Sequence, residues 1–592
     1  MYNSLKNVQI LISLLKKYGI KNLVISPGGR STPFVYSVEQ DPFFKIYSIV
    51  DERSASFFAL GLTAELKEPV AVCCSSGTAV ANHVSAACEA FYQQLPLLII
   101  SADRNHNYMY QQEEQMVPQE KLMEGFSKKI ITLGHVRDEK DFWYASRICN
   151  EALLELTTGE KGPVHINYVV ENDYPVHHGI VKFEEENLPD VKKIDKLSLE
   201  DSDEKWLTYV SKFKNSKILI IYGQNSPLEE NEIKIVEDFA KKYNCVISTD
   251  LLSNLHCKYS ISTYSISRMV NQQEKEDICP DIIITMNANT VSDIKTILTP
   301  FKDKFEHIHV SQKGQVSDPF KKLSDIIACS PIMFFKKFAQ LAGNDTDNHS
   351  YYEKLRSYLD RIGINGSLNN ENIKYSSLYA VQQLMKNIPE NSLLHLANSM
   401  SVRFANFFDL AKNVNVYCNR GTNGIDGSMS SFIGQASISK CPSFLIIGDL
   451  SFFYDMNALW NQYVGKNIRI LVINNSGGAI FYNFPGRGNV PTVGQYIAAE
   501  HTTSVKDWAE SRGFKYISAI NKDETDSAIK ELLNTSSDYP IILEAFTNKD
   551  EDIKAYNSIL ENYKTQTLKQ KVWDNIPEGG LKNTIREIIS KG

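Results

Sequence analysis

The sequence lacks the features that would place it in several specialised classes of protein. No apolar run approaches the roughly 20 residues of a membrane span, and residues 1–17 lack the unbroken apolar core of a signal peptide. There is no basic tract and the formal net charge is −7, so we expect no nucleic-acid partner. The 10 cysteines contain no C-x-x-C pair, which gives a zinc site no support and predicts reduced thiols in a cytoplasmic protein.

What the sequence contains instead is a long globular chain in which apolar runs alternate with helical stretches. Its 592 residues, 43% hydrophobic and 22% charged, are enough for several domains. The alternation predicts an α/β fold of three doubly wound domains, each with a mainly parallel sheet. The expected units are a first domain over 1–180, a central domain over 205–341, a third domain over 373–548 and a tail over 549–592, with linkers between the domains.

The apolar runs predict the strands of these sheets, and the turns after them carry the candidate chemistry. In the first domain the runs are 22–25, 45–50, 70–74, 95–100 and 164–167; in the central domain 217–222, 245–248, 281–285 and 307–310; in the third domain 393–396, 443–447, 468–473 and 540–544.

Two polar turns in the third domain point to a metal site. Residues 448–451, Gly-Asp-Leu-Ser, follow one apolar run, and residues 474–478, Asn-Asn-Ser-Gly-Gly, follow the next. If these runs are adjacent parallel strands, Asp449 and Asn475 meet at the carboxyl edge of the sheet. A carboxylate, an amide oxygen and a nearby backbone carbonyl suit Mg²⁺ bound to a diphosphate. The alternative is that both are ordinary strand-to-helix turns.

Four turns of the first domain hold further candidates. Arg30 projects from a glycine turn and Arg104 ends another strand, and arginine binds carboxylates bidentately. Glu52 begins a helix of small and apolar residues, so it is either an acidic residue favoured in a first helical turn or a carboxyl group that handles a proton. The turn at 75–82 offers hydroxyls and backbone N–H groups to an anion, although it also reads as a plain helix start.

The third domain also carries candidate residues in the turns after its strands, and the central domain has few such candidates. Ser399 and Arg403 lie one helical turn apart after one strand. Arg420 precedes a glycine-rich turn in which Ile425 is unexpectedly bulky. The central domain has no G-x-G-x-x-G motif and is expected to be a scaffold, with Lys295 as a weak candidate for lending a charge to a neighbouring site.

The spacing of the two polar turns resembles the cofactor signature of the thiamine-diphosphate enzymes. Asp449 and Asn475 stand 26 positions apart, as Gly-Asp and Asn-Asn do in that signature. The resemblance implies that Asp449, Asn475 and the main chain of Gly477 bind Mg²⁺, or Mn²⁺ in its place. Leu450 stands where the common form has glycine, which argues against acetolactate synthases and simple 2-oxo acid decarboxylases.

The three-domain layout resembles the pyruvate-oxidase-like branch of these enzymes over nearly the whole chain. In that branch the cofactor lies between two subunits, which implies a homodimer or a dimer of dimers. Glu52 matches the catalytic glutamate that hydrogen-bonds the aminopyrimidine ring, and Ile425 matches the residue that bends the cofactor. The cofactor-binding residues implied by the resemblance are Ser75, Gly77, Gln115, Ser399, Arg420, Gly424, Ile425, Ser451 and Asn475.

Within this branch the loops are similar to those of one family, the menaquinone-pathway synthases that decarboxylate 2-oxoglutarate and add the product to isochorismate. The shared motifs include Ser-Pro-Gly-Gly-Arg-Ser-Thr-Pro, Asp-Glu-Arg, Ala-Asp-Arg and Gly-Asp-Leu-Ser, with Gly29 where the family more often has serine. Both substrates carry carboxylates, which suits an arginine-rich site. The substrate-binding residues implied are Arg30, Arg104, Gln115, Lys295, Arg403 and Arg420. The alternatives are another thiamine-diphosphate decarboxylase or carboligase, and a non-catalytic paralogue that only binds the cofactor.

Overall fold

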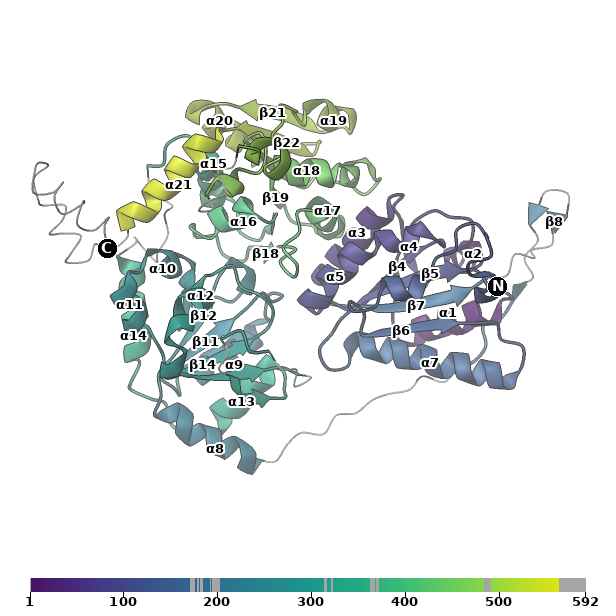
Figure 1. The fold of residues 1–592 in the computed structure, drawn as a ribbon, viewed down its shortest axis with the longest axis horizontal. Helices are drawn as coiled ribbons and strands as arrows, with labels where there is room; N and C mark the ends of the chain where they lie inside the picture. The colour runs from purple at the N-terminus through teal and green to yellow at the C-terminus, as the bar shows by residue number, and fades with distance from the viewer. Residues whose placement is uncertain are drawn as a thin grey trace, which may run out of the picture.

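The protein is described by a computed structural model that contains three parallel, six-stranded sheets covered by helices (Figure 1). The structure describes residues 2–170, 176–177, 180–181, 185–191, 193, 203–312, 317–320, 323–361, 368, 372–483 and 491–563. Within these residues no helix has the length and apolar character needed to cross a bilayer. All 10 cysteines lie in the described parts of the chain, and no disulfide is described among them. The expected fold class, several parallel-sheet α/β units, is confirmed.

The first sheet has the strand order β3-β2-β4-β5-β7-β6. Its strands are β2 (Asn22–Ile25), β3 (Lys45–Ser48), β4 (Val70–Cys74), β5 (Leu97–Asp103), β6 (Lys129–Leu133) and β7 (Val164–Val169). The central strand β4 is buried at every position because helices cover both faces of the sheet. The helices are α1 (Lys6–Lys17), α2 (Thr32–Glu39), α3 (Glu52–Leu66), α4 (Thr78–Asn82), α5 (Val84–Gln93), α6 (Gln119–Leu122) and α7 (Glu139–Thr157).

The central sheet has the strand order β13-β12-β11-β14-β15-β16. Its strands are β11 (Ile218–Tyr222), β12 (Cys245–Thr249), β13 (Ser260–Ser262), β14 (Ile282–Met286), β15 (Glu306–Val310) and β16 (Leu323–Ile327). The helices are α8 (Asp203–Lys214), α9 (Glu230–Ala240), α10 (Thr263–Met269), α11 (Gln272–Asp277), α12 (Ile294–Leu298), α13 (Pro331–Leu341) and α14 (Ser350–Asp360). Helix α14 lies in a segment expected to be a linker, and its Tyr351, Leu355 and Leu359 are buried in the core of this unit.

The third sheet has the strand order β18-β17-β19-β20-β22-β21. Its strands are β17 (Leu393–Leu396), β18 (Asn415–Tyr417), β19 (Ser443–Gly448), β20 (Ile468–Asn474), β21 (Lys515–Ala519) and β22 (Ile541–Phe546). The helices are α15 (Ser377–Asn387), α16 (Met400–Ala405), α17 (Ser428–Ala436), α18 (Asp449–Tyr454), α19 (Lys506–Ser511), α20 (Lys522–Leu532) and α21 (Lys549–Tyr563). Most of the first expected linker, and the tail beyond Tyr563, lie outside the described residues.

Five strands of the three six-stranded sheets have no counterpart among the predicted runs: β6, β13, β16, β18 and β21. All five lie at the edges of their sheets. An edge strand is covered on fewer sides, so its sequence carries fewer apolar residues; β21, Lys-Tyr-Ile-Ser-Ala, is exposed at two of its five positions.

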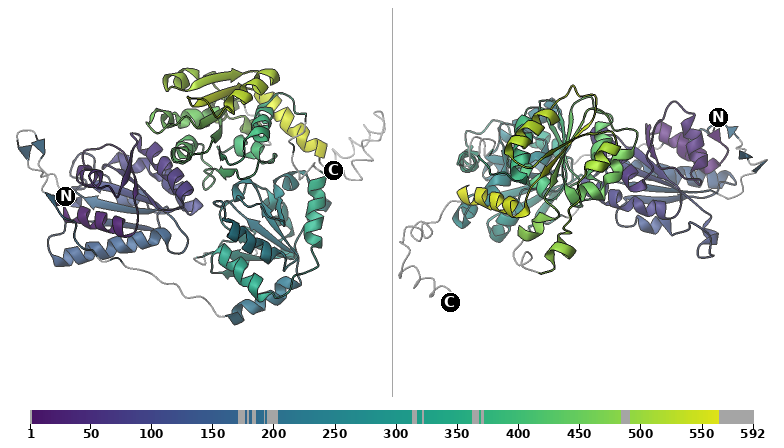
Figure 2. Two further views of the ribbon diagram at one scale, coloured as in Figure 1. Left: turned by 180° about the vertical axis from the view of Figure 1, so that it is seen from behind. Right: turned by 90° about the horizontal axis from the view of Figure 1, so that it is seen from above.

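The third domain contacts both of the others (Figure 2). Helix α3 of the first domain packs against α17 of the third, and both contribute to one hydrophobic core that includes Phe58 and Phe432. The central and third domains share another core, in which Tyr264 stacks edge-to-face on Phe407 with ring centroids 5.0 Å apart. The third domain is therefore packed against both of the other domains.

Candidate active site

The expected metal anchor lies where two neighbouring strands of the third sheet end. Strands β19 and β20 pair in parallel, with Gly448 opposite Ile473, so the turns after them are adjacent. The Asp449 side chain is 2% exposed. Its Oδ2 accepts a hydrogen bond from the Gly477 amide at 2.9 Å, and its Oδ1 accepts one from the Leu450 amide at 2.6 Å. The structure thus brings Asp449 and Gly477 into direct contact.

Burial and charge both act on Asp449. Desolvation raises the pKa of this carboxyl group, while the hydrogen bonds from Leu450 and Gly477 and the nearby His501 oppose the rise. The His501 Nε2 atom lies 3.3 Å from Asp449 Oδ2. A divalent cation would stabilise the charged carboxylate in the same way, so the site favours a cation. Nothing in the sequence pattern pointed to His501.

The orientation of Asn475 is set by a residue that the sequence analysis missed. Asn475 Nδ2 donates to Asp552 Oδ2 at 2.8 Å, which leaves the amide oxygen of Asn475 free to face a ligand. Asp552 is buried and also accepts the Ser377 amide at 2.6 Å. Gly477 has a φ of +134°, and a Cβ there would lie 2.7 Å from the Ala498 carbonyl oxygen. The donor set, a carboxylate, an amide oxygen and a close backbone, fits Mg²⁺.

The other expected diphosphate residues lie in loops that are bonded to this anchor. Ser451 Oγ donates to the Ile425 carbonyl oxygen at 2.6 Å, which ties α18 to the glycine-rich loop. The Asn398 side chain donates to the Gly424 carbonyl oxygen at 2.7 Å, so Ser399, the next residue, adjoins the same loop. Asn398 is another functional candidate that the sequence pattern did not reveal, as are His501 and Asp552.

Arg403 and Arg420 form a positive pair in the third domain. Arg403 donates to the Ser399 carbonyl oxygen at 2.7 Å. Burial lowers the pKa of Arg403, and the positive charge of Arg420 lowers it further. Arg268 of the central domain adds another positive charge nearby, partly balanced by Asp293 at 2.8 Å. Two guanidinium groups held together in this way create a strong preference for an anion.

Lys295 does not belong to this group in the structure. It is exposed on α12. The charges described as acting on Arg403 are those of Arg420, Tyr264, Arg268 and Asp293, and Lys295 is not among them. Its substrate-binding role stays a prediction, and Arg268 is the central-domain cation whose charge reaches Arg403.

A second candidate half-site is a cavity of about 470 Å³ in the first domain. Glu52 lies on its wall, half-buried, and its Oε2 accepts from Asn82 Nδ2 at 3.1 Å. The surroundings of Glu52 are polar although its helix is rich in small and apolar residues. Glycine, serine and arginine of the strand-end loops form the wall, while α3 turns its apolar residues to the core. The lining residues are Pro27, Gly28, Gly29, Arg30, Glu52, Ser75, Ser76, Thr78, Ala79, Asn82, Gln115 and Val170.

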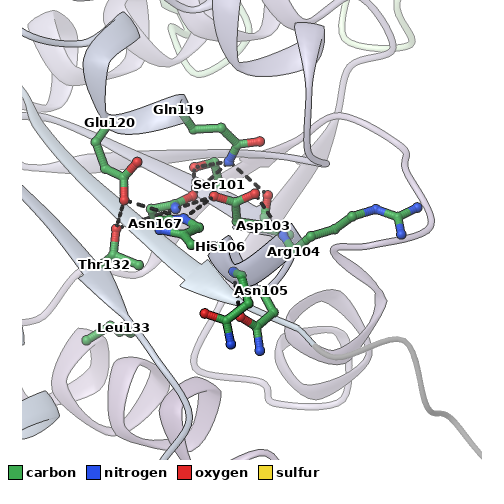
Figure 3. Close-up of polar contacts among 12 residues, drawn as sticks. Ser101, Asp103, Arg104, Asn105, His106, Gln119, Glu120, Thr132, Leu133 and Asn167 are labelled. Atoms are coloured by element: carbon green, nitrogen blue, oxygen red, sulfur yellow. Dashed lines mark hydrogen bonds and ion pairs between the residues drawn. The ribbon is translucent and has the colours of Figure 1, made fainter. Parts of the chain in front are cut away.

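A buried polar network supports Gly77 and Arg104 beside this cavity (Figure 3). Gln119 is fully buried; its Oε1 accepts the Gly77 amide at 2.7 Å, and its Nε2 donates to Asn167 Oδ1 at 2.8 Å. The Arg104 amide donates to Asp103 at 2.7 Å. Its side chain donates to Glu113 at 2.8 Å. Figure 3 shows the Arg104 side chain extended away from the network.

The same network contains three side chains whose ligand atoms are close enough together to bind a metal ion. Ligand atoms of Asp103, His106 and Glu120 lie within 4.8 Å of one another. However, Asp103 already accepts from Asn167 at 2.7 Å, and Glu120 accepts from Thr132. These bonds satisfy the carboxylates within the chain, so we assign the group to support of the loops and not to metal binding.

The overall fold and the first domain both match known proteins. Benzoylformate decarboxylase from Polynucleobacter necessarius superposes with a TM-score of 0.68 over 93% of this chain and 99% of that one, at 16% identity, which shows a shared fold. Residues 5–124 match the family described as thiamine pyrophosphate enzyme, N-terminal TPP binding domain. This match includes the cavity residues from Pro27 to Gln115.

Curated relatives are similar over nearly the whole length. A 2-succinyl-5-enolpyruvyl-6-hydroxy-3-cyclohexene-1-carboxylate (SEPHCHC) synthase from Phocaeicola vulgatus is 37% identical over 93% of this chain and 97% of the relative. Another from Bacteroides fragilis is 37% identical over 95% of this chain and 99% of the relative. One from Flavobacterium johnsoniae is 32% identical over 92% and 97%. The chain belongs to the SEPHCHC synthase family.

In this member of the SEPHCHC synthase family, the two half-sites come from different domains. Every residue that lines the Glu52 cavity comes from the first domain. The anchor at Asp449 and the arginine pair come from the third domain. The described part of a single chain therefore offers two half-sites and not one continuous pocket.

Two histidines near the Glu52 cavity are core residues. His83 and His165 are fully buried. Burial lowers the pKa of His83 to about 4 and that of His165 to about 3. Both are therefore neutral near pH 7, as is typical of histidines buried in a protein core.

Proposed function

We propose that the protein decarboxylates 2-oxoglutarate and adds the resulting succinyl unit to isochorismate, releasing CO₂ and forming SEPHCHC for menaquinone synthesis. The observation that carries this proposal is the pair of cations Arg403 and Arg420. Arg403 is partly buried on α16, and Arg420 is buried in the glycine-rich loop, which Ser451 links to the Asp449 anchor. The printed names of relatives that match nearly the full chain support it. A site for pyruvate, with one carboxylate, would not need so many cations.

The chain's own residues would bind and orient the substrates. Arg403 and Arg420 on one side, and Arg30 beside Glu52 on the other, offer guanidinium groups to the several carboxylates of the two substrates. Each such charge-assisted hydrogen bond contributes about 1.5–3 kcal/mol where water is excluded. Bound thiamine diphosphate would supply the carbanion chemistry that breaks and forms the carbon–carbon bonds.

Glu52 is the proposed catalytic residue of the first domain. It would hydrogen-bond the aminopyrimidine ring of the cofactor and hold a proton there. Asn82 fixes one of its carboxylate oxygens at 3.1 Å and leaves the other for the cofactor. Ser75, Gly77 and Gln115 would surround the ring, because all three lie at or beside the same cavity.

Mg²⁺ is the proposed metal, with Mn²⁺ able to take its place. Asp449, the amide oxygen of Asn475 and the main chain of Gly477 would bind it against the diphosphate. Ser399, Gly424, Ile425 and Ser451 would line the diphosphate and the bend of the cofactor. The oxygen donor set supports this assignment because hard cations prefer oxygen ligands.

The active unit is proposed to be a homodimer, alone or within a dimer of dimers. The Glu52 cavity of one chain would face the Asp449 anchor of its partner, because the two half-sites of one chain do not form a shared pocket in the described residues. A cytoplasmic location is also part of the proposal and is supported by the 10 cysteines, among which no disulfide is described.

The test is an assay of purified protein with thiamine diphosphate, Mg²⁺ and both substrates. Isochorismate absorbance should fall only when every component is present. CO₂ release from 2-oxoglutarate without loss of isochorismate would retain the donor and overturn the acceptor. Turnover of pyruvate instead would indicate another decarboxylase or carboligase of the thiamine-diphosphate class. Cofactor binding without any turnover would indicate a non-catalytic paralogue.

A further inference from the structure

The loop of the third domain that carries Arg420 is hydrogen-bonded to a carboxylate of the first domain. Glu89 on α5 of the first domain is 2% exposed. Its Oε1 accepts the Gly421 amide at 2.8 Å. Its Oε2 accepts both the amide and the hydroxyl of Thr422, each at 2.9 Å. Residues more than 330 positions apart are thus joined by three hydrogen bonds to one buried carboxylate.

These bonds act on the peptide group next to Arg420. The Gly421 N–H belongs to the peptide that begins with the Arg420 carbonyl, so fixing it fixes the ψ angle of Arg420. The fit is close: a Cβ on Gly421 would lie 2.8 Å from the Glu89 carbonyl oxygen and 3.0 Å from the Tyr92 Cβ. The loop therefore lies against α5 at a distance that only glycine permits.

The central domain holds the strand and turn just before Arg420. Asn254 exchanges two hydrogen bonds with the backbone of Val416, at 2.8 and 2.7 Å. Gln224 Nε2 donates to the Cys418 carbonyl oxygen at 2.7 Å. The backbone on the amino-terminal side of Arg420 is thus bound by the central domain, and the backbone on its carboxyl-terminal side by Glu89.

We propose that Glu89 is a positioning residue that places the Arg420 guanidinium for a substrate carboxylate. The inference rests on the proposed role of Arg420 in substrate binding. A carboxylate that accepts two successive backbone N–H groups orients both peptide planes, which a single hydrogen bond would not do. The consequence is that the first domain shapes the substrate site of the third domain within the same chain.

If Glu89 only joined the two domains, its substitution would lower stability and leave substrate affinity unchanged. Glu65 provides the matched control for this alternative. Glu65 on α3 accepts a hydrogen bond from the Tyr417 hydroxyl at 2.7 Å. It joins the same two domains near the same segment, but it touches a side chain and not the peptide beside Arg420. Glu65→Gln should therefore lower stability without changing substrate affinity.

The experiment compares Glu89→Gln with Glu65→Gln in the full chain loaded with thiamine diphosphate and Mg²⁺. We expect Glu89→Gln to raise KM for 2-oxoglutarate or isochorismate by about tenfold to 100-fold, because small displacements of a binding group have effects of this size. Glu65→Gln should leave both KM values within about twofold of the wild type. Equal KM values in the two variants would overturn the inference.

A double-mutant cycle identifies the group through which Glu89 acts. If Glu89 works through Arg420, adding Glu89→Gln to Arg420→Ala should change KM by less than about twofold. If the KM increases caused by Glu89→Gln and Arg420→Ala multiply in the double mutant, the inference would be overturned. If the wild type turns over but Arg420→Ala leaves both KM values unchanged, the inference fails while the proposed reaction stands.

A milder substitution covers the case in which Glu89→Gln does not fold. Thr422→Val removes only the hydroxyl bond to Glu89 and keeps the shape of the side chain. We expect a smaller KM increase in the same substrate, with unchanged unfolding temperature. A Thr422→Val enzyme with wild-type KM values for both substrates would count against the proposed positioning.

Discussion

Gly61 and Gly434 each occupy the point where one helix meets the backbone of the other. A Cβ on Gly61 of α3 would lie 2.1 Å from the Ser431 carbonyl oxygen of α17. A Cβ on Gly434 of α17 would lie 2.3 Å from the Phe58 carbonyl oxygen of α3. The two helices can cross this closely only because both positions lack a side chain. This crossing joins the domain of Glu52 to the domain of Asp449.

Substituting Gly61 by alanine should therefore destabilise the protein. Alanine normally stabilises a helix interior relative to glycine, but here its methyl group would force α3 away from α17 at a cost of about 1–3 kcal/mol. The measurement is the unfolding temperature of Gly61→Ala. Gly134→Ala is the control, because a Cβ there meets nothing within 4 Å. A Gly61→Ala protein as stable as the wild type would contradict the described crossing.

Glu52→Gln should keep cofactor binding and lose most of the turnover. Glutamine keeps the size of the side chain but cannot exchange a proton, and loss of such a group typically lowers rates about 10²–10⁴-fold. Cofactor affinity and kcat would be measured separately on the same preparation. Turnover equal to that of the wild type would remove Glu52 from the mechanism.

Asp552→Ala should weaken metal binding although Asp552 is not a proposed ligand. The substitution removes the acceptor that orients the Asn475 amide at 2.8 Å. Loss of such a supporting hydrogen bond typically lowers metal affinity about 10–100-fold. Activity measured against free Mg²⁺ should shift to higher concentration and recover at saturation. An unchanged Mg²⁺ midpoint would show that the orientation of Asn475 does not depend on Asp552.

Asp455 should make stability depend on pH. It is fully buried and accepts the amide and hydroxyl of Ser430, each at 2.6 Å. Burial raises its pKa to about 7 against the opposing effect of these hydrogen bonds. The native state thus holds this proton more tightly than the unfolded chain, so this contribution to stability is present at low pH and is lost as pH rises toward 7.

The measurement is the free energy of unfolding of the wild type and of Asp455→Asn between pH 5 and 8. The wild type should lose stability relative to the variant as pH rises, by at most about 1.4 kcal/mol per pH unit. Asparagine does not titrate, so it provides the reference at each pH. A difference that stays constant over this range would mean that Asp455 does not titrate there.

Local sequence was sufficient to predict the strand-and-turn units of the site. Apolar runs such as β4 and β19 are continuous because both faces are covered, so they could be recognised without a structure. The turns that carry Asp449 and Asn475 were expected to be adjacent because each follows such a run. Strands β19 and β20 do pair in parallel, and the amide of Gly477, in the second turn, donates to Asp449 at 2.9 Å. The catalytic and ligand roles of these residues are still predictions.

Contacts between distant segments could not be predicted in the same way. Asp552 lies 77 positions after the Asn475 that it orients. Gln119 binds the Gly77 amide across 42 positions, and no spacing rule links the two. These residues are buried polar groups, and a single sequence does not distinguish them from exposed residues of the same type.

The sequence by itself determined the three α/β units, the order of polar turns at their strand ends and the resemblance to thiamine-diphosphate enzymes, because all of these depend on residues close together in the chain. Only the tertiary structure decided which turns meet. The Glu89 carboxylate selects its partners at Gly421 and Thr422 through the packing of one domain on another. The closeness of α3 and α17 likewise depends on two glycines more than 370 positions apart, whose fit exists only when both helices are in place.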